Sequence, residues 1–219
     1  YFDGANGGLM HKGWLDYYGV RYYLHATDGY MLNSGLEQID GEKYYFDPSG
    51  AIATWWRSVG NDFYLFGNDG RMLKGWQNPS GYWYYLDSVT GIMQTGWLRL
   101  GQHAYYLEDS GVMCTGGKWI DGKWYYFDGA NGGLMHKGWL DYYDTWYYLH
   151  PTEGHMQTGW ITLGENYYYM GNSGAMSTGW QWIDGNCYYF DAQCGGLMQR
   201  SKWIGQYWVD ENGVWDPNR

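Results

Sequence analysis

The sequence is poor in the aliphatic residues from which most globular domains build a core. Leu, Ile, Val and Phe together make up only about 16% of the 219 residues. Combined with a formal net charge of −10, so low a content would ordinarily indicate disorder. Aromatic residues reverse that interpretation, because they make up 22% of the chain, with 26 Tyr and 16 Trp. Rings carry large buriable area, so we expect a thin structure packed through rings, without a thick central core.

Positive charge, long apolar runs and cysteine are also scarce. With 13 Lys and Arg against 23 Asp and Glu, nucleic acid is not an expected partner, because phosphate binding needs a basic face. The acidic balance favours a cationic ligand instead. No apolar run reaches the roughly 20 residues of a membrane-spanning helix. Three Cys are too few for a disulfide framework; Cys187 and Cys194 either pair across one hairpin or remain free.

A repeat of about 21 residues runs through the chain. The segment from Tyr1 to Tyr18 recurs unchanged from Tyr126 to Tyr143, an identity too long to arise by chance. Because the chain opens at Tyr1 in the middle of a repeat, we expect it to be a fragment of a longer surface or secreted protein. One position of successive units holds methionine, with Ile52 in the single gap: Met10, Met31, Met72, Met93, Met113, Met135, Met156, Met176 and Met198.

Each unit has the pattern of one β-hairpin. In the unit from Trp139 to Thr158, Trp146–Leu149 is the expected aromatic strand, Thr152–Gly154 the turn and His155–Thr158 the returning strand. The Gly-Trp pair is expected in the loop between hairpins. A lone hairpin is marginally stable, so each must stack on its neighbours. The sequence therefore predicts an all-β solenoid of tandem hairpins, with about ten units in a single repeat domain over residues 1–219.

Three units share a variant with the pattern I-D-G-x-x-Y-Y-F-D, at Ile39, Ile120 and Ile183. Two of them, at Tyr125 and Tyr188, carry a longer turn that ends in Gly-Gly-Leu-Met, 63 residues apart, and the first residues of the chain repeat that turn 125 residues earlier. These spacings predict roughly three hairpins per superhelical turn. A history of duplication would explain them equally well.

The sequence contains no pattern typical of an enzyme. The carboxylates after the aromatic strands occupy one repeat position, where Asp serves hairpin turns, and the His residues also follow the repeat. No nucleophile elbow, phosphate loop or zinc signature is present. We therefore expect no catalysis, no metal and no cofactor. The turn carboxylates concerned are Asp47, Asp87, Asp128 and Asp191.

The tryptophans offer a binding chemistry. The Trp of a Gly-Trp pair, an aromatic residue just before the Tyr pair and a ring from the next unit can surround a small space. With Met as a soft floor, such rings form an aromatic cage for a quaternary ammonium. The alternative is that these rings are only the core of the solenoid, which is the favoured interpretation for the paired tyrosines.

The sequence resembles the choline-binding repeats of Gram-positive cell-wall proteins. The shared pattern is G-W-x(5–6)-W-Y-Y-L-x(4)-G-x-M-x-T-G-W, and Gly75–Trp97 and Gly138–Trp160 match it nearly throughout. The resemblance implies a left-handed β-solenoid that holds choline groups of teichoic acids between consecutive repeats. It also implies a secreted module at the bacterial cell wall, without membrane insertion, whose end repeats can pair into a homodimer.

Carried over position by position, the resemblance implies three complete cages. The first combines Trp76, Trp83 and Tyr105 with Met93. The second combines Trp139, Trp146 and Tyr168 with Met156, and the third Trp160, Tyr167 and Tyr188 with Met176. The remaining units are expected to be structural spacers. In these the second ring is replaced by Arg21, Lys43, Asp62, Ala104 or Cys187, and the Gly-Trp ring by Leu36 or Gly117.

A related class is the main alternative, namely the glucan-binding repeats of secreted glucosyltransferases and the similar repeats of clostridial toxins. The I-D-G units look more like these. A sugar would use one flat ring as a platform, with Asp, Asn, Gln or Lys beside it for hydroxyl hydrogen bonds. Complete three-ring cages favour choline, degenerate units leave room for glucan, and a purely structural spacer is the third alternative.

Overall fold

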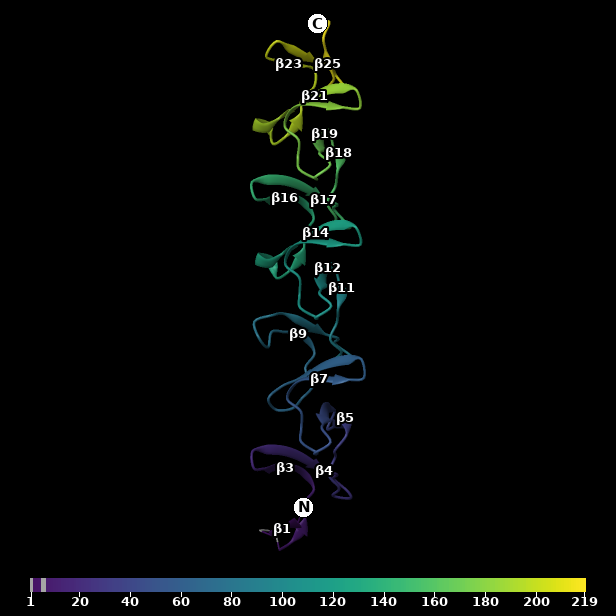
Figure 1. The fold of residues 1–219 in the computed structure, drawn as a ribbon, viewed down its shortest axis with the longest axis vertical. Coiled ribbons are helices and arrows are strands. Elements are labelled where there is room, and N and C mark those ends of the chain that lie inside the picture. Colours follow the sequence, from purple (N-terminus) through teal and green to yellow (C-terminus); the bar gives the residue numbers. More distant parts are fainter. Residues whose placement is uncertain (1, 5–6) are drawn as a thin grey trace. The chain divides into compact units, whose positions relative to one another are not determined.

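The computed structural model describes residues 2–4 and 7–219, and these form an all-β chain of successive antiparallel hairpins (Figure 1). The strands pair in chain order: β1 (Phe2–Asp3) with β2 (Leu9–Met10), β3 (Gly13–Tyr17) with β4 (Val20–Leu24), β5 (Gly35–Ile39) with β6 (Glu42–Phe46), β7 (Trp55–Val59) with β8 (Asp62–Phe66), β9 (Gly75–Gln77) with β10 (Tyr84–Leu86), and β11 (Gly96–Leu100) with β12 (His103–Leu107). The second half continues with β13 (Gly116–Ile120), β14 (Lys123–Asp128) and β15 (Leu134–Met135), β16 (Gly138–Tyr142) with β17 (Thr145–Leu149), β18 (Gly159–Leu163) with β19 (Asn166–Met170), β20 (Gly179–Ile183), β21 (Asn186–Asp191) and β22 (Leu197–Met198), and β23 (Lys202–Ile204), β24 (Tyr207–Val209) and β25 (Trp215–Asp216).

The contacts divide the chain into two compact units, residues 1–100 with 105–114 and residues 101–104 with 115–219. Within each unit the hairpins follow one another as a solenoid, which confirms the predicted fold class. Hairpins three repeats apart project to the same side: β3 and β9 in the first unit, and β14 and β21 in the second (Figure 1). The assignment of residues 1–219 to a single domain stays a prediction.

The hairpin itself differs from the expected one. The Gly-Trp pair lies in a strand, because Trp139 of β16 pairs with Tyr148 of β17. These strands are joined by Tyr143 and Asp144, which both have positive φ, as a type I′ turn requires. The expected returning strand is reduced to a single bridge between Leu149 and Met156. The predicted pairing was wrong because the two-residue turn lies before the aromatic strand. The aromatic strand therefore pairs with the Gly-Trp segment that precedes it, and not with the segment that follows it.

The I-D-G units close their hairpins with the Asp-Gly pair, in which both residues have positive φ, as at Asp121 and Gly122. Their longer turns, seen after β14 and β21, are single 3₁₀ turns, η2 (Gly129–Asn131) and η3 (Ala192–Cys194). Asp128 and Asp191 cap these turns by accepting backbone N–H groups. In the copy of this turn at the start of the chain, residues 5–6 lie outside the described residues.

The deepest core position is aliphatic or Phe. In most repeats the last apolar residue of the second strand is 0–2% exposed. Most rings before it are only partly buried, and the buried ones, Tyr44, Tyr64, Tyr125 and Tyr148, remain 6–9% exposed. This departs from a core made of rings, because a Tyr hydroxyl or Trp N–H needs a polar partner that the deepest position does not offer. The residues at this position are Leu24, Phe46, Phe66, Leu86, Leu107, Phe127, Leu149, Met170, Phe190 and Val209.

Consecutive repeats are joined at the methionine. The Met156 backbone N–H donates to the Trp124 carbonyl oxygen of the preceding repeat at 2.8 Å. The Met135 side chain packs on the turn of the following repeat, where a Cβ placed on Gly154 would lie 2.5 Å from its sulfur. Gly154 also has φ +79°, so the turn needs glycine for both conformation and space. The repeat is therefore held by a backbone hydrogen bond and a Met–Gly contact.

The described residues include no helix that is long and apolar enough to cross a membrane. The fold positions its functional side chains on the faces of hairpins.

Replacing Gly154 by Ala tests this junction. Strain at positive φ alone costs about 1–2 kcal/mol, and the clash with Met135 adds about 1–3 kcal/mol to the loss of unfolding free energy. Urea unfolding followed by circular dichroism measures the loss. Gly164 is the matched control, because its φ is +62° and no atom lies within 4 Å of the point that an alanine Cβ would occupy there. Equal losses for Gly154→Ala and Gly164→Ala would contradict the Met–Gly contact.

Candidate functional site

The strongest candidate site is a cluster of three rings where hairpin β16–β17 meets hairpin β18–β19. The ring of Trp139 lies 6.3 Å from that of Trp146 and 4.9 Å from that of Tyr168, with interplanar angles of 83° and 73°. Asp141 is opposite Trp146 in the ladder, so Trp139 and Trp146 share one face of their hairpin. Tyr168 comes from the next repeat. The structure thus brings together all three rings predicted for the second cage.

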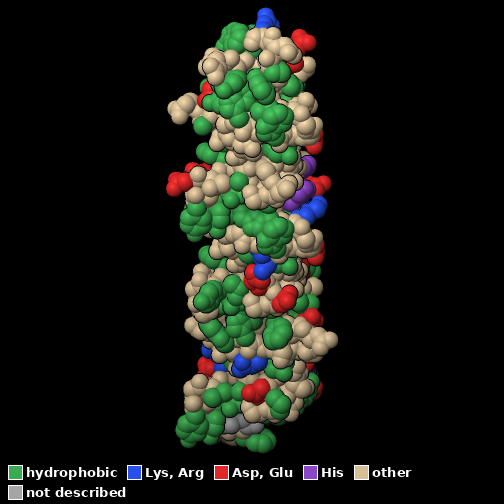
Figure 2. Space-filling view, turned by 45° about the horizontal axis from the view of Figure 1, so that its top comes forward, with side chains coloured by type: hydrophobic (Ala, Val, Ile, Leu, Met, Phe, Trp, Pro, Cys, Tyr) green, Lys and Arg blue, Asp and Glu red, His purple; other side chains and the backbone are tan. Residues whose placement is uncertain are grey.

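A pocket of about 340 Å³ opens between these rings. Its remaining walls are Met176, from the returning segment of the next repeat, and Cys194 and Gly195, from the turn that contains η3. All the residues that line it are uncharged, and Trp146 stays 45% exposed. On the face seen in Figure 2, hydrophobic side chains form separate surface patches, with few Lys or Arg side chains among them. The rings are therefore accessible to a ligand.

The methionine beside this cage differs from the expected one. Met156 packs against the turn at Gly174, and its N–H bonds to the repeat before. The Met176 N–H donates to the Trp146 carbonyl at 2.8 Å, and Met176 lines the pocket. The reason is that each returning segment runs along the hairpin of the preceding repeat. The floor methionine is therefore supplied one repeat later than expected.

The first predicted cage has the same ring geometry. The ring of Trp76 lies 6.5 Å from that of Trp83 and 4.9 Å from that of Tyr105, at angles of 84° and 65°. The Met113 N–H donates to the Trp83 carbonyl at 2.8 Å, as Met176 does at Trp146. Met113 therefore occupies the place for which the sequence predicted Met93.

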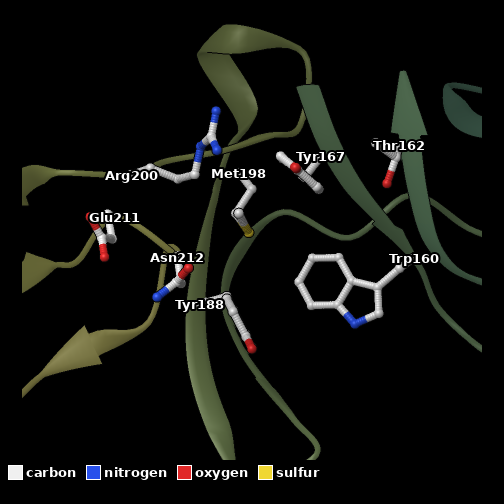
Figure 3. Close-up of a pocket in the computed structure, with 8 residues that line it drawn as sticks. All are labelled: Trp160, Thr162, Tyr167, Tyr188, Met198, Arg200, Glu211 and Asn212. Carbon is white, nitrogen blue, oxygen red and sulfur yellow. The ribbon is translucent and has the colours of Figure 1, made fainter. Parts of the chain in front are cut away.

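The third predicted cage carries additional charged groups. The ring of Trp160 lies 4.9 Å from that of Tyr188 at 77°, and both line a pocket of about 300 Å³ with Tyr167 (Figure 3). The floor is Met198 in place of Met176. The pocket is also lined by Thr162, Arg200, Glu211 and Asn212.

A further ring cluster was missed from the sequence, because this repeat was aligned one residue out of register, which placed Asp62 at the position of the second ring. Phe63, and not Asp62, stands before the tyrosine, because the Met93 N–H donates to the Phe63 carbonyl as its equivalents do at Trp83 and Trp146. The ring of Trp56 lies 5.0 Å from that of Tyr84 at 64°. Phe63 follows Trp56 by seven residues, as Trp83 follows Trp76 and Trp146 follows Trp139. The unit assigned as a spacer because of Asp62 therefore has a ring at each position of a cage.

A second missed cluster surrounds Cys187. It forms a pocket of about 260 Å³ whose other walls are four rings: Trp180, Trp182, Tyr207 and Trp215. Tyr207 lies 5.7 Å from Trp180 and 6.0 Å from Trp215, with nearly perpendicular planes. Rings from unexpected positions thus replace the one absent at Cys187. The extra Trp in Trp180-Gln-Trp182 was the available signal.

In two other units, which stay predicted spacers, a side chain of the chain itself lies at the expected place of a ligand or ring. The Arg21 guanidinium lies 5.8 Å from the Trp14 ring and is paired with Asp16 at 2.8 Å, so the chain's own cation covers that ring. At Gly117, a Cβ would lie 2.6 Å from the Trp124 ring, which fills the space of the absent Gly-Trp ring.

His136 positions the second cage. Its Nε2 lies 2.8 Å from the Trp139 carbonyl oxygen, and because a carbonyl only accepts, the Nε2–H must donate. This hydrogen bond fixes the backbone from which the Trp139 ring projects.

The turn carboxylates hold turns, as expected. Asp47 accepts from the Ser49 N–H and hydroxyl, which lowers the pKa of the Asp47 carboxyl. Asp87 accepts from the backbone N–H and hydroxyl of Thr90, with the same effect on its pKa. Within residues 2–4 and 7–219, no group of three His, Cys, Asp or Glu is placed to hold a metal ion.

Cys187 and Cys194 are free thiols in this structure, which answers the question of their pairing. Cys187 is buried, and burial raises the pKa of its thiol. Cys194 is exposed, and a hydrogen bond with Asp191 is the main cause of its raised pKa.

Family models match most of the repeats. A model described as a choline-binding repeat matches residues 53–96, 73–117, 94–139, 114–158 and 157–203, which together cover more than half of the chain. A model described as a putative cell wall binding repeat matches residues 34–52.

Two solved structures from Streptococcus pneumoniae are similar over nearly the whole chain. CbpJ is 29% identical, with a TM-score of 0.71, covering 96% of this chain and 95% of that one. Choline binding protein F, in the presence of a peptidoglycan analogue, is 31% identical with a TM-score of 0.76, covering 95% and 87%. Toxin B of Clostridioides difficile is 46% identical over 50 residues, 23% of this chain and only 2% of the toxin.

The raised pKa of Cys194 predicts slow alkylation. At pH 8.5 less of its thiol is ionised than in an ordinary cysteine, so iodoacetamide labelling should be slow and should accelerate as the pH rises above 9. Asp191→Asn keeps a side chain that can cap η3 but removes the negative charge, so it should speed labelling at pH 8.5. Peptide mass spectrometry measures the rate at Cys194, with buried Cys187 as the slow reference. An unchanged rate in Asp191→Asn would contradict the assigned cause.

Proposed function

Because the chain belongs to the choline-binding repeat family, we propose that it is a non-catalytic module that attaches to bacterial cell walls by binding choline groups of teichoic acids. The observation that carries this proposal is the cage of Trp139, Trp146 and Tyr168, in which the Trp139 ring lies close to both other rings at steep angles and Trp146 is open to solvent. The module acts outside the cell, at the wall. Pairing of its end repeats into a homodimer stays a prediction.

The chemistry of the second cage suits a quaternary ammonium. Such a cation has no N–H to donate, so it gains little from polar groups and most from ring faces and methyl contacts. The uncharged lining of this pocket supplies both. Each ring contributes about 0.5–2 kcal/mol of cation–π attraction. Three rings, less the cost of association, give about −4 kcal/mol, which corresponds to a Kd of about 1 mM.

Weak single sites suit a polymeric ligand. A teichoic acid with many choline groups engages several cages at once, and avidity then raises the affinity by about 10²–10⁴. The clusters centred on Trp56 and on Trp180 extend the number of sites that contribute beyond the three predicted from the sequence. The repetition is therefore functional as well as architectural.

The side chains that most often serve catalysis have other tasks here. Asp47, Asp87, Asp128 and Asp191 accept hydrogen bonds from turn backbone. The hydroxyls of Ser49 and Thr90 donate to Asp47 and Asp87 within the same turns, and so they also hold turn structure. These placements support a module whose contribution is attachment.

Glucan is the second candidate ligand, on a separate observation. Trp119 lies on an I-D-G hairpin, outside the three predicted cages, and is 65% exposed. A flat exposed indole is a platform for a sugar ring. A glucan-binding module would therefore depend on Trp119 more than on Trp139.

Choline titration separates the two candidates. Tryptophan fluorescence of the whole chain should change and saturate at millimolar choline, whereas ethanolamine, which lacks the three methyl groups, should bind much more weakly. Because Cys194 lines the second cage, choline should also slow its alkylation, and Trp139→Ala should abolish that protection.

Trp119→Ala is the matched control, since it also removes one indole of the second unit but leaves every predicted cage intact. It should bind choline as the unaltered chain does. A fluorescence response to dextran and none to choline, lost in Trp119→Ala, would overturn the choline proposal in favour of glucan.

A further inference from the structure

We propose that the Trp160 pocket selects a zwitterion, a quaternary ammonium with an anionic group a few bonds away, and that Arg200 binds the anionic group. The proposal rests on the proposed function, because the ammonium would use the same kind of ring cluster. It assigns Arg200 as a specificity-determining residue and makes this pocket different from the second cage.

Arg200 lies beside the rings of the pocket. Its guanidinium carbon is 4.9 Å from the centroid of the Tyr167 ring, and one terminal nitrogen donates to the Glu165 carbonyl at 3.1 Å. Figure 3 shows the side chain at the edge of the pocket, across from Trp160. Among the described residues Arg200 makes no ion pair, and its guanidinium has further N–H groups that can donate.

A bare cation would bind poorly here. The guanidinium already covers the Tyr167 ring, so an ammonium loses one ring and meets a like charge a short distance away. The second cage has no such obstacle, because uncharged residues line it. The same ligand should therefore discriminate between the two pockets.

An anionic group on the ligand reverses this effect. The planar guanidinium matches a carboxylate or a phosphate with two parallel hydrogen bonds, while the ammonium rests on Trp160 and Tyr188. Asn212 adds an amide donor to the same pocket. Glu211 also lines it, and its negative charge offsets part of the attraction. We therefore expect a modest preference, about twofold to fivefold.

Arg21 provides an internal comparison. It also lies over an indole, that of Trp14, but Asp16 neutralises it at 2.8 Å. Because its charge is already neutralised by a carboxylate, such an arginine attracts a second anion only weakly. The unpaired state of Arg200 is what distinguishes the Trp160 pocket.

The test follows individual indole N–H signals by nuclear magnetic resonance of the ¹⁵N-labelled chain. Trp160→Phe and Trp139→Phe assign the two signals. Choline, glycine betaine and phosphocholine are then titrated separately. At Trp160, at least one of the two zwitterions should half-saturate at a concentration about twofold to fivefold below that of choline. At Trp139, choline should bind at least as well as either zwitterion. The two zwitterions distinguish a carboxylate from a phosphate preference.

Variants isolate the cause. Arg200→Gln should lower the zwitterion-to-choline preference at Trp160 to the value at Trp139, and Glu211→Gln should raise it. Arg99→Gln is the matched control, because Arg99 also lies over an indole, 5.8 Å from the Trp97 ring, and it should leave the preference unchanged.

Two results would overturn the inference: choline binding at Trp160 as tightly as both zwitterions, or the same preference in Arg200→Gln. Its failure is separable from that of the proposed function. If choline moves the Trp139 signal but Trp160 shows no zwitterion preference, only the inference fails. If choline moves neither signal, and no zwitterion does either, both fail.

Discussion

The structure depends on the junction between consecutive hairpins. A two-stranded hairpin has one ladder of hydrogen bonds and cannot bury its own rings. The junction adds a backbone hydrogen bond, such as Met176 N–H to the Trp146 carbonyl, and a methionine packed on the next turn glycine. Each repeat is thus stable only beside its neighbours, as in other repeat architectures. Glycine at the turn is required because a Cβ there would collide with the methionine.

The cages are a consequence of the same junction. Alternate residues of a strand point to opposite faces, so Trp139 and Trp146 project from one face of their hairpin and Tyr168 reaches them from the following hairpin. Each of the ring clusters described above takes residues from more than one repeat. The chain therefore makes its binding pockets by stacking, and differences between pockets come from the residues that each later repeat supplies. Uncharged residues complete the Trp139 pocket, whereas Arg200 and Glu211 complete the Trp160 pocket.

The methionine period and the aromatic runs were enough to predict a hairpin solenoid, and the resemblance to choline-binding repeats supplied the ring triplets. Pairing within the hairpin was predicted wrongly, although the Asp-Gly pair at Asp121 and Gly122 is a strong signal for a type I′ turn. The shift of the floor methionine by one repeat depends on how the returning segment crosses the previous hairpin, which no sequence period reveals. Phe63 was recoverable from spacing alone. The position of Arg200 over Tyr167 was not, because it depends on a side chain that reaches back to an earlier repeat.

The central claim is that choline binds across the junction between repeats, and its most direct test is thermal unfolding of the chain at increasing choline concentration. A ligand that binds only the stacked state stabilises it by about 2.7 kcal/mol per site at 100 times its Kd. The account predicts a Tm that rises steadily through the millimolar range with choline and much less with ethanolamine at equal ionic strength. A Tm that responds equally to both, or to neither, would contradict it.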